Sequence, residues 1–278
     1  MVRLKISNNL IISEITEVGF TKPEISSVAR QLNEVASTVD TRITTFKGKN
    51  AFTSYHNGLR CDWVDNVPAI PDLKNNHRVY FFTKRLFDIT AASLALIALS
   101  PLFLFIALSL KLFEKEPVFF KQERVGYQNR IFKMYKFRTM HHHRCDASGV
   151  EQTQIDDERV TKFGRFLRKT SIDELPQLIN ILRGEMSLVG PRPFVKGQLA
   201  TGKPYKEVVP YYDLRHLVVP GLTGWSQANG YRGQTDKKNR AIGRIENDMA
   251  YIQNMSIWLD IKIIFLTIKN EFFTGSGH

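Results

Sequence analysis

The sequence lacks the features that mark several large protein classes. It holds only two cysteines, Cys61 and Cys145, so no disulfide framework is expected and a reducing compartment is the default. It has no P-loop, no Gly-x-Gly-x-x-Gly pattern and no nucleophilic serine elbow, which removes the usual signs of an NTPase, a dinucleotide enzyme and a serine hydrolase. Met1 is followed by a polar stretch without a short apolar core, so no secretory signal is predicted.

Acidic residues are also in deficit. The 278 residues include 39 Lys and Arg against 27 Asp and Glu, which gives a net charge of +12. That surplus favours a polyanionic partner, whether nucleic acid, anionic lipid headgroups or a phosphorylated substrate. The positive charge is the one observation in favour of a nucleic-acid partner, so we do not expect such a partner. Hydrophobic residues make up 43% of the chain, enough for a core in one large domain or two small ones.

Only one long apolar run is present, from Ile89 to Leu110. It is about 22 residues long, or roughly 33 Å as a straight helix, which is enough to span a bilayer. Lys84 and Arg85 precede the run and Lys111 follows it. Basic residues on both flanks give no orientation for a spanning helix. The run indicates a membrane helix whose direction the charges do not define.

Ser100 and Pro101 lie in the middle of this run. Proline lacks a backbone donor and clashes with the preceding turn, so we expect a kink there. The carbonyl that it leaves free in hydrocarbon needs a partner, which the Ser100 hydroxyl can supply. Two paths stay open on physical grounds: a helix that dips in and returns to the same face, and a spanning helix with a tolerated proline. A buried core helix is less favoured, because no polar stripe interrupts the run.

The rest of the chain divides around this helix. Residues 1–78 form a polar extension of unknown role, with one amphipathic helix indicated by Val28, Leu32, Val35 and Val39 and a linker at Pro68 and Pro71. Residues 79–115 form the membrane segment, and residues 116–278 a further domain. Its predicted elements are a β-hairpin over Pro117–Phe137 with turn candidates Gly126 and Asn129, a mostly helical stretch over Asp157–Leu182, and helices over Arg244–Tyr251 and Ser256–Lys269. The last helix has the pattern of an interfacial helix.

Two adjacent carboxylates, Asp173 and Glu174, stand out in this domain. Leu175, Leu178, Ile179 and Leu182 follow helical spacing, and proline at position 176 places the start of that helix at residues 171–173. Ser171 and Glu174 match a capping box, and Gly184 ends the helix. Acidic residues are common in a first turn. On this pattern alone, capping is favoured over catalysis.

The surrounding cations change that balance. Asp173 and Glu174, called the dyad from here on, are preceded by Arg159, Arg165 and Arg168. Arg192 follows the dyad between two prolines, and Lys136 and Arg138 add further positive charge. Arginine binds phosphate oxygens bidentately. Mg²⁺ would bridge the carboxylates and a phosphate, and a carboxylate can itself attack phosphorus. His141, His142, His143 and Cys145 lack metal-site spacing, so a polar loop is predicted there.

Several longer motifs occur in a fixed order along the chain. They are Lys84–Asp88, Ser100-Pro101, Lys136–Met140, Leu167-Arg168, Asp173–Gln177, Ser187–Pro193 and Pro220–Trp225. This ordered set resembles the bacterial sugar transferases, the monotopic phosphoglycosyl transferases, over roughly Thr83 to Phe273. The segment Thr223–Asp236 is similar to the glucose 1-phosphate transferases that initiate exopolysaccharide assembly.

The resemblance implies an α+β fold: a mostly helical cytoplasmic domain with a small β-hairpin, anchored in the bacterial inner membrane by a re-entrant helix-break-helix kinked at Ser100 and Pro101. It implies transfer of a sugar 1-phosphate, expected to be glucose 1-phosphate, from a UDP-sugar to undecaprenyl phosphate with release of UMP. Asp173 would be the nucleophile and Glu174 its assistant through Mg²⁺ or a proton.

The same resemblance assigns phosphate binding to Arg168 and Arg192, and we add Lys136, Arg138 and Arg159 from their charge. Galactose or an N-acetylated sugar is the alternative donor, and a non-catalytic membrane scaffold is the alternative class. Membrane lipid is an expected partner, and a homodimer is also considered.

Overall fold

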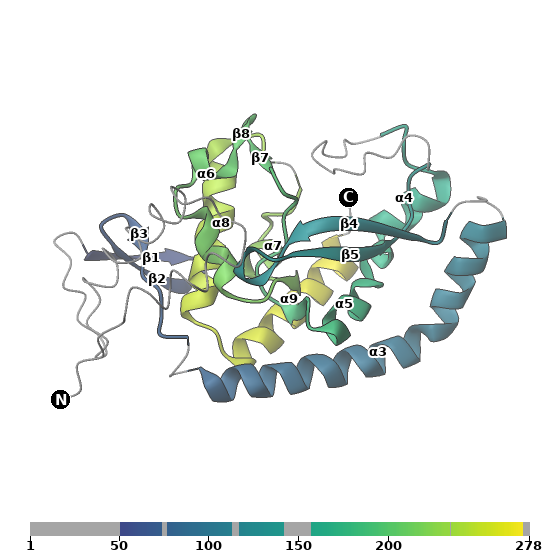
Figure 1. Ribbon diagram of the computed structural model, residues 1–278, viewed down its shortest axis with the longest axis horizontal. Helices are drawn as coiled ribbons and strands as arrows, with labels where there is room; N and C mark the ends of the chain where they lie inside the picture. The colour runs from purple at the N-terminus through teal and green to yellow at the C-terminus, as the bar shows by residue number, and fades with distance from the viewer. Residues whose placement is uncertain (1–50, 74–76, 113–116, 142–156, 234, 275–278) are drawn as a thin grey trace. The chain divides into compact units, whose positions relative to one another are not determined.

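The structure is a computed structural model that describes residues 51–73, 77–112, 117–141, 157–233 and 235–274 (Figure 1). The amphipathic helix predicted around Val28 to Val39 lies outside these residues. The described residues form two compact units: residues 51–53 and 62–69 belong to one, and residues 54–61 with the described residues from 70 onwards belong to the other. Each is described by itself.

A three-stranded sheet was not foreseen in the N-terminal segment. It consists of β1 (Ala51–His56), β2 (Leu59–Val64) and β3 (Val67–Pro68), in that order. The turn between β1 and β2 is Asn57-Gly58, with φ values of 53° and 88°. Both values are positive, as the tight turn of a two-residue hairpin requires, and Asn-Gly is the preferred pair. This dipeptide was the sequence signal for the hairpin.

Helix α3 (Arg78–Leu112) contains the long apolar run. In the described part of the chain it is the one helix long and apolar enough to cross a membrane. It continues through Pro101 without a break, and Figure 1 shows it curving in its second half. The Ser100 hydroxyl donates to the carbonyl of Ile97 at 2.8 Å, the group that proline leaves without its helical partner. The predicted role of Ser100 is therefore confirmed.

Both halves of α3 pack on the rest of the larger unit. One hydrophobic cluster joins Ala92 to Phe132, Met134, Leu178, Ile181 and Met186. A second cluster joins Ile106 and Leu110 to Phe137 and Leu167. The opposite face of α3 stays exposed, with large apolar side chains at Phe82, Leu86, Leu94, Ile97, Leu104, Phe105, Leu108 and Leu112. A helix with one packed side and one exposed apolar side is suited to lie between a domain and lipid.

The predicted hairpin is confirmed as β4 (Phe119–Val125) and β5 (Ile131–Phe137), joined by the short helix η1 (Tyr127–Asn129). The strands are antiparallel, and Phe120 lies opposite Lys136 while Arg124 lies opposite Phe132. Side chains alternate along a strand, so the even-numbered residues share one face. Phe132 and Met134 on that face are buried in the core.

Two helices and a 3₁₀ helix form the segment around the dyad. Helix α4 (Lys162–Lys169) is followed by the 3₁₀ helix η3 (Ile172–Glu174) and by α5 (Gln177–Arg183). Helix α5 contacts both α3 and β5, and Figure 1 shows it between them. The strands β6 (Ser187–Val189) and β9 (Gly221–Thr223) form a parallel pair that was not predicted.

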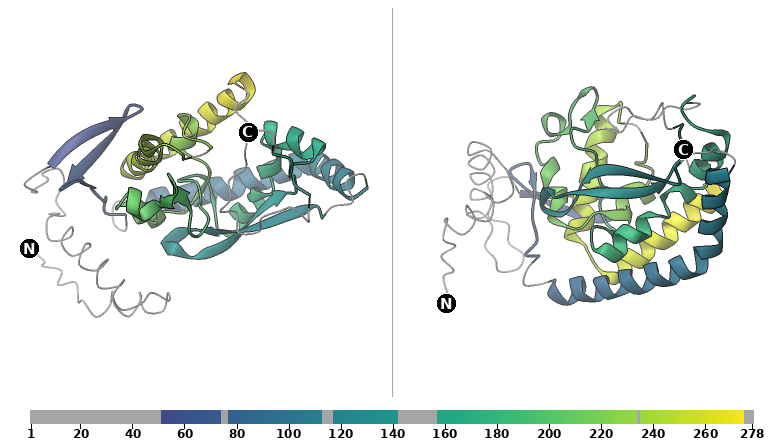
Figure 2. Two further views of the ribbon diagram at one scale, coloured as in Figure 1. Left: turned by 90° about the horizontal axis from the view of Figure 1, so that it is seen from above. Right: turned by 45° about the vertical axis from the view of Figure 1, so that its right-hand side comes forward.

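The remaining elements complete the unit (Figure 2). They are β7 (Leu199–Ala200), β8 (Lys203–Pro204), α6 (Tyr205–Val208), η4 (Tyr212–Leu217), α7 (Trp225–Ala228), α8 (Lys238–Gln253) and α9 (Ile257–Thr274). Helices α8 and α9 confirm the two predicted C-terminal helices. The described residues mix helices with four small sheets. The fold is thus α+β, but it contains more strand pairs than the single hairpin that was predicted.

Candidate active site

The dyad occupies the short 3₁₀ helix η3 and not the first turn of α5. The predicted helix start at residues 171–173 is therefore wrong. Pro176 has no backbone N–H to continue an α-helix backwards, and the amide of Leu175 instead donates to the carbonyl of Ile172 at 3.1 Å. Helix α5 begins at Gln177 after this turn, and it ends at Gly184 as predicted.

The predicted capping box is also absent, because Ser171 and Glu174 have other partners. Ser171 adopts a left-handed backbone conformation with φ of 54° and makes no side-chain cap bond. Its hydroxyl donates to Glu271 Oε2 at 3.0 Å. Glu174 turns its carboxylate towards two cations. The two residues that match a capping pattern in sequence are thus used to build a charged site.

Glu174 lies between Lys136 and Arg192. Lys136 Nζ lies 2.7 Å from Glu174 Oε1, and Arg192 donates from one terminal nitrogen to Oε2 at 2.9 Å and from the other to Oε1. Burial raises the pKa of Glu174, but the charges of Arg192 and Lys136 outweigh it and hold the pKa well below its usual range. Glu174 is thus a fixed anion that positions two cations.

Asp173 differs from its neighbour. Only 6% of it is exposed, and Lys136 Nζ is 4.0 Å from its Oδ2. Among the residues that the structure describes, none donates a hydrogen bond to its carboxylate. Burial raises the pKa of Asp173 to about 6, assisted by Glu174 and opposed by Lys136, Arg168 and Arg192. A buried carboxylate beside cations, without donors of its own, is suited to attack an electrophile.

The loop that carries Arg192 is held at several points, as expected for a preorganised site. Its backbone is tied by Gly190 N to Thr223 O at 2.9 Å and by Gly221 N to Pro191 O at 3.0 Å. A Cβ at Gly221 would collide with the backbone of Gly190. Glycine is therefore required where this loop crosses β9.

The other residues predicted to bind phosphate, Arg168, Arg138 and Arg159, each have a different partner. Arg168 acts electrostatically on Asp173 and donates from Nε to Thr139 Oγ1 at 2.8 Å. Arg138 stacks over the ring of Phe120, 5.7 Å from its centre. Arg159 pairs with Asp157 at 2.7 Å, so its charge is already matched. The structure thus brings Lys136, Arg168 and Arg192 near Asp173 and Glu174, while Arg159 pairs with Asp157.

Sequence reasoning missed two groups at this site. Arg124 of β4 acts electrostatically on both Arg192 and Glu174. Glu271 of α9 accepts from Ser171 and pairs with Arg232. The hairpin register was a signal for Arg124, because it places this residue on the face of Lys136. Nothing local in the sequence connects Glu271 to Ser171.

The metal-binding capacity of the site follows from these contacts. In the described residues, no group of three or more His, Cys, Asp or Glu could hold a metal ion. Glu174 is occupied by two cations, while the Asp173 carboxylate accepts no hydrogen bond there. Mg²⁺ commonly takes one or two carboxylates and completes its shell with water and substrate phosphates. The donors fit a Mg²⁺ ion that binds together with a phosphate, and not a preformed cage.

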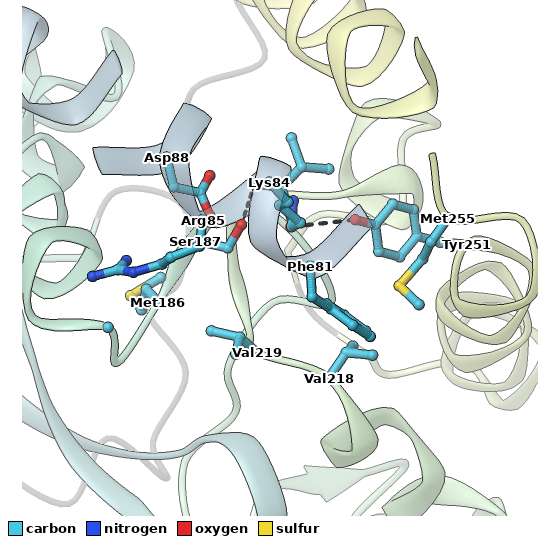
Figure 3. A pocket seen from close by; sticks show the side chains of 12 residues that line it. Phe81, Lys84, Arg85, Asp88, Met186, Ser187, Val218, Val219, Tyr251 and Met255 are labelled. Carbon is cyan, nitrogen blue, oxygen red and sulfur yellow. Dashed lines mark hydrogen bonds between the residues drawn. The ribbon is translucent and has the colours of Figure 1, made fainter. Parts of the chain in front are cut away.

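A small cavity of about 80 Å³ lies elsewhere, against α3. Figure 3 shows Phe81, Lys84 and Asp88 of α3 lining it together with Met186, Val218 and Tyr251. The Lys84 ammonium is matched by Asp260 of α9 at 2.7 Å. This cavity contains neither Asp173 nor Glu174. Its second cation, Arg85, donates to the backbone carbonyls of Ile181 and Leu182.

Comparison with known proteins gives relatives over most of the chain. An undecaprenyl-phosphate glucose phosphotransferase of Komagataeibacter xylinus is 51% identical over 194 residues, 70% of this chain and 36% of that protein. An exopolysaccharide production protein PSS of Rhizobium leguminosarum bv. phaseoli is 48% identical over 194 residues, 70% of this chain and 97% of that protein. A UDP-N-acetylgalactosamine-undecaprenyl-phosphate N-acetylgalactosaminephosphotransferase of Aeromonas hydrophila is 44% identical over 203 residues, 72% of this chain and 45% of that protein.

The matched part of the chain thus spans less than half of the Komagataeibacter and Aeromonas proteins but nearly all of the Rhizobium protein. The sequence profile of the bacterial sugar transferases matches residues 79–274, which include α3, the dyad, the Arg192 loop and α9. The chain therefore belongs to the bacterial sugar transferase family.

Proposed function

We propose that this protein is an enzyme that transfers a sugar 1-phosphate from a UDP-sugar to undecaprenyl phosphate. The observation that carries the proposal is the buried Asp173 carboxylate, without hydrogen-bond donors among the described residues and next to Lys136, Arg168 and Arg192. Phosphoryl transfer depends on alignment and neutralisation of charge, which such a cluster supplies. The Komagataeibacter relative is named for this acceptor and for glucose.

The chemistry divides into two displacements at one phosphorus atom. In the first, an Asp173 oxygen forms a bond to the sugar-proximal phosphorus of the UDP-sugar, the bond to the bridging oxygen breaks, and UMP leaves with the electron pair. In the second, an oxygen of undecaprenyl phosphate bonds to that phosphorus and the Asp173 carboxylate is released. Glu174 holds Lys136 and Arg192 in place throughout. Mg²⁺, when bound, supplies further charge neutralisation of the diphosphate.

The proposed intermediate, a sugar phosphate bonded to Asp173, can be tested directly. Incubation with UDP-glucose and Mg²⁺, without lipid acceptor, should release UMP and add one hexose phosphate to the protein, which intact-mass measurement detects. The Asp173→Asn protein should show no adduct. Full turnover by Asp173→Asn would exclude Asp173 as the nucleophile. EDTA should abolish UMP release, and Mg²⁺ should restore it.

The donor is proposed to be UDP-glucose, and UDP-N-acetylgalactosamine is the second candidate because the Aeromonas relative is named for it. Turnover measured against a panel of UDP-glucose, UDP-galactose and the two N-acetylated UDP-sugars separates them. A preference of about tenfold for glucose supports the first candidate. A protein that binds membranes but turns over no member of the panel would instead be the non-catalytic scaffold.

We further propose that α3 enters the bacterial cytoplasmic membrane and returns to the same face, with residues 116–278 as the catalytic domain in the cytoplasm. Two contacts support this path. Lys84 near one end of α3 pairs with Asp260 of α9 at 2.7 Å, and Leu110 near the other end packs with Leu167 of α4. A helix that crossed the bilayer would separate these two ends by the hydrocarbon thickness of about 30 Å.

Cysteine labelling tests the path. Arg78 and Lys111 are exposed at the two ends of α3, and each can be replaced by cysteine in a protein without Cys61 and Cys145. A membrane-impermeant maleimide should label both variants in inverted membrane vesicles and neither in intact spheroplasts. Labelling of one variant from each side would instead establish a spanning helix.

A further inference from the structure

Arg124 is placed at the dyad by the register of the hairpin. Arg124 of β4 and Lys136 of β5 lie on the same face, because the pairs Phe120 with Lys136 and Arg124 with Phe132 put even-numbered residues together. The next residue, Val125, donates from its amide to the carbonyl of Phe194 at 2.9 Å. That bond ties the end of β4 to the loop that carries Arg192.

Arg124 has few polar partners among the residues that the structure describes. One terminal nitrogen donates to the neutral amide oxygen of Gln122, and the buried Nε has no partner in the described residues. No carboxylate in the described part of the chain forms an ion pair with it. Burial lowers the pKa of Arg124 to about 9, and the Arg192 charge acts in the same direction. The group still stays protonated at neutral pH.

Glu174 attracts Arg124 electrostatically, but it forms no ion pair with this guanidinium. Glu174 is already bound by both Lys136 and Arg192. Glu174 is thus shared among three cations, Lys136, Arg192 and Arg124. Arg124 is half-buried, and keeping such a cation beside another one without an ion-pair partner costs stability. A buried polar atom without a partner calls for an explanation, and a bound ligand is one.

We propose that Arg124 binds a phosphate group of the substrate through its guanidinium, next to the phosphate held by Arg192. This inference rests on the proposed function, because a phosphorylated substrate must reach Asp173. The ligand chemistry is a phosphate oxygen pair, which suits the planar guanidinium. The diphosphate of the UDP-sugar and the phosphate of the lipid acceptor are its two sources in that reaction.

The first experiment measures binding and stability without turnover. Arg124→Met should weaken binding of UDP by about tenfold or more, as for the loss of a hydrogen-bonded charge pair. It should leave the melting temperature of the ligand-free protein unchanged or higher, since an uncompensated charge is removed. Lys121→Met is the matched control: Lys121 is an exposed cation of the same strand on the opposite face, 5.3 Å from the ring of Tyr135. It should change neither quantity.

A second variant keeps Arg124 but pairs its guanidinium with a protein carboxylate, so that it can no longer bind a phosphate. Gln122→Glu places a carboxylate where Arg124 already donates a hydrogen bond. The new ion pair should raise the melting temperature and weaken UDP binding. If Arg124 has only a structural role, Gln122→Glu leaves UDP binding and the KM values for the UDP-sugar and the polyprenyl phosphate unchanged, and that result overturns the proposal.

Kinetic measurements separate the two phosphate sources. A rise in the KM for the UDP-sugar, parallel to the loss of UDP binding, assigns the donor diphosphate. A rise in the KM for a short-chain polyprenyl phosphate alone, with UDP binding intact, assigns the acceptor phosphate. Values within twofold of wild type for UDP binding and for both KM constants overturn the inference. Because UDP binding does not require transfer, a wild-type protein that binds UDP but transfers nothing would refute the proposed function and leave this site testable.

Discussion

Arg215 donates a hydrogen bond from a terminal guanidinium nitrogen to the backbone carbonyl of Arg192 at 2.6 Å. The same nitrogen lies 2.8 Å from Asp248 Oδ2, and the guanidinium lies 3.9 Å from the centre of the Phe194 ring. Arg215 is only 2% exposed. A buried ion pair outside the charged cluster thus fixes the backbone of the residue whose side chain binds Glu174.

Arg215→Lys should lower turnover of the UDP-sugar about tenfold, because a misplaced catalytic group loses alignment even when its side chain is intact. Lysine keeps a positive charge for Asp248 but lacks the second donor, Arg215 Nε, which binds Asp248 Oδ2 at 3.1 Å and fixes the direction of the bond to the Arg192 carbonyl. The measurement is kcat and KM together with the melting temperature.

The control for this prediction loses a buried hydrogen bond away from the dyad. Tyr251→Phe removes the bond from the Tyr251 hydroxyl to Asp260 Oδ1, which is 2.8 Å long. It should lower stability by about 1 kcal/mol with little effect on kcat. Equal losses of kcat in both variants at matched stability would contradict a positioning role for Arg215.

Asp173→Asn should stabilise the protein at pH 8. Burial raises the pKa of Asp173 to about 6 in the folded state, above its value of about 3.9 in an unfolded chain. Between these values the folded state binds more protons, so stability falls as pH rises from about 4 to about 6. The asparagine variant escapes this loss, which amounts to at most about 3 kcal/mol. Its melting temperature should exceed that of wild type at pH 8 and match it near pH 4.

Glu174→Gln should have the opposite effect on stability. The substitution leaves Lys136 and Arg192 close together without the carboxylate that binds both. The three side chains are partly exposed, so we expect a loss of about 1–2 kcal/mol at pH 8, reduced by solvent screening. Thermal unfolding of the two dyad variants side by side is the measurement. A melting temperature of Glu174→Gln at or above that of wild type would show that Glu174 does not hold the two cations.

Helix α9 should insert its exposed apolar face into lipid. Trp258, Ile261, Phe265 and Ile268 are exposed at helical spacing, and Trp258 is 82% exposed. The other two tryptophans, Trp63 and Trp225, are buried. Lipids brominated in their acyl chains should therefore quench mainly Trp258 emission, and Trp258→Phe should remove most of the quenching. Undiminished quenching in that variant would mean that α9 is not the lipid-facing helix.

The elements with strong local signals were predictable from the sequence. The apolar run, the hairpin, the glycine that ends α5 and the hydroxyl of Ser100 all depend on neighbouring residues, and the structure confirms each. The parallel pair β6 and β9 was not predictable, because Ser187 and Gly221 pair across a long separation in sequence. The predicted start of α5 was wrong because Ser171 and Glu174 match a capping box in sequence. In the structure Ser171 binds Glu271 and Glu174 binds Arg192, so the capping bonds do not form.

Two adjacent carboxylates, several arginines and a membrane-length helix with a proline could be identified without any coordinates. These follow from composition and local periodicity, which do not depend on long-range contacts. The pairing of these carboxylates with particular cations depends on the three-dimensional arrangement of the chain. This arrangement binds Glu174 to Lys136 and Arg192, leaves Asp173 buried without a donor from the described residues, and brings Arg124 beside Arg192. The energy of a charge depends on its distances to other charges and on its burial, and neither is a property of the sequence order.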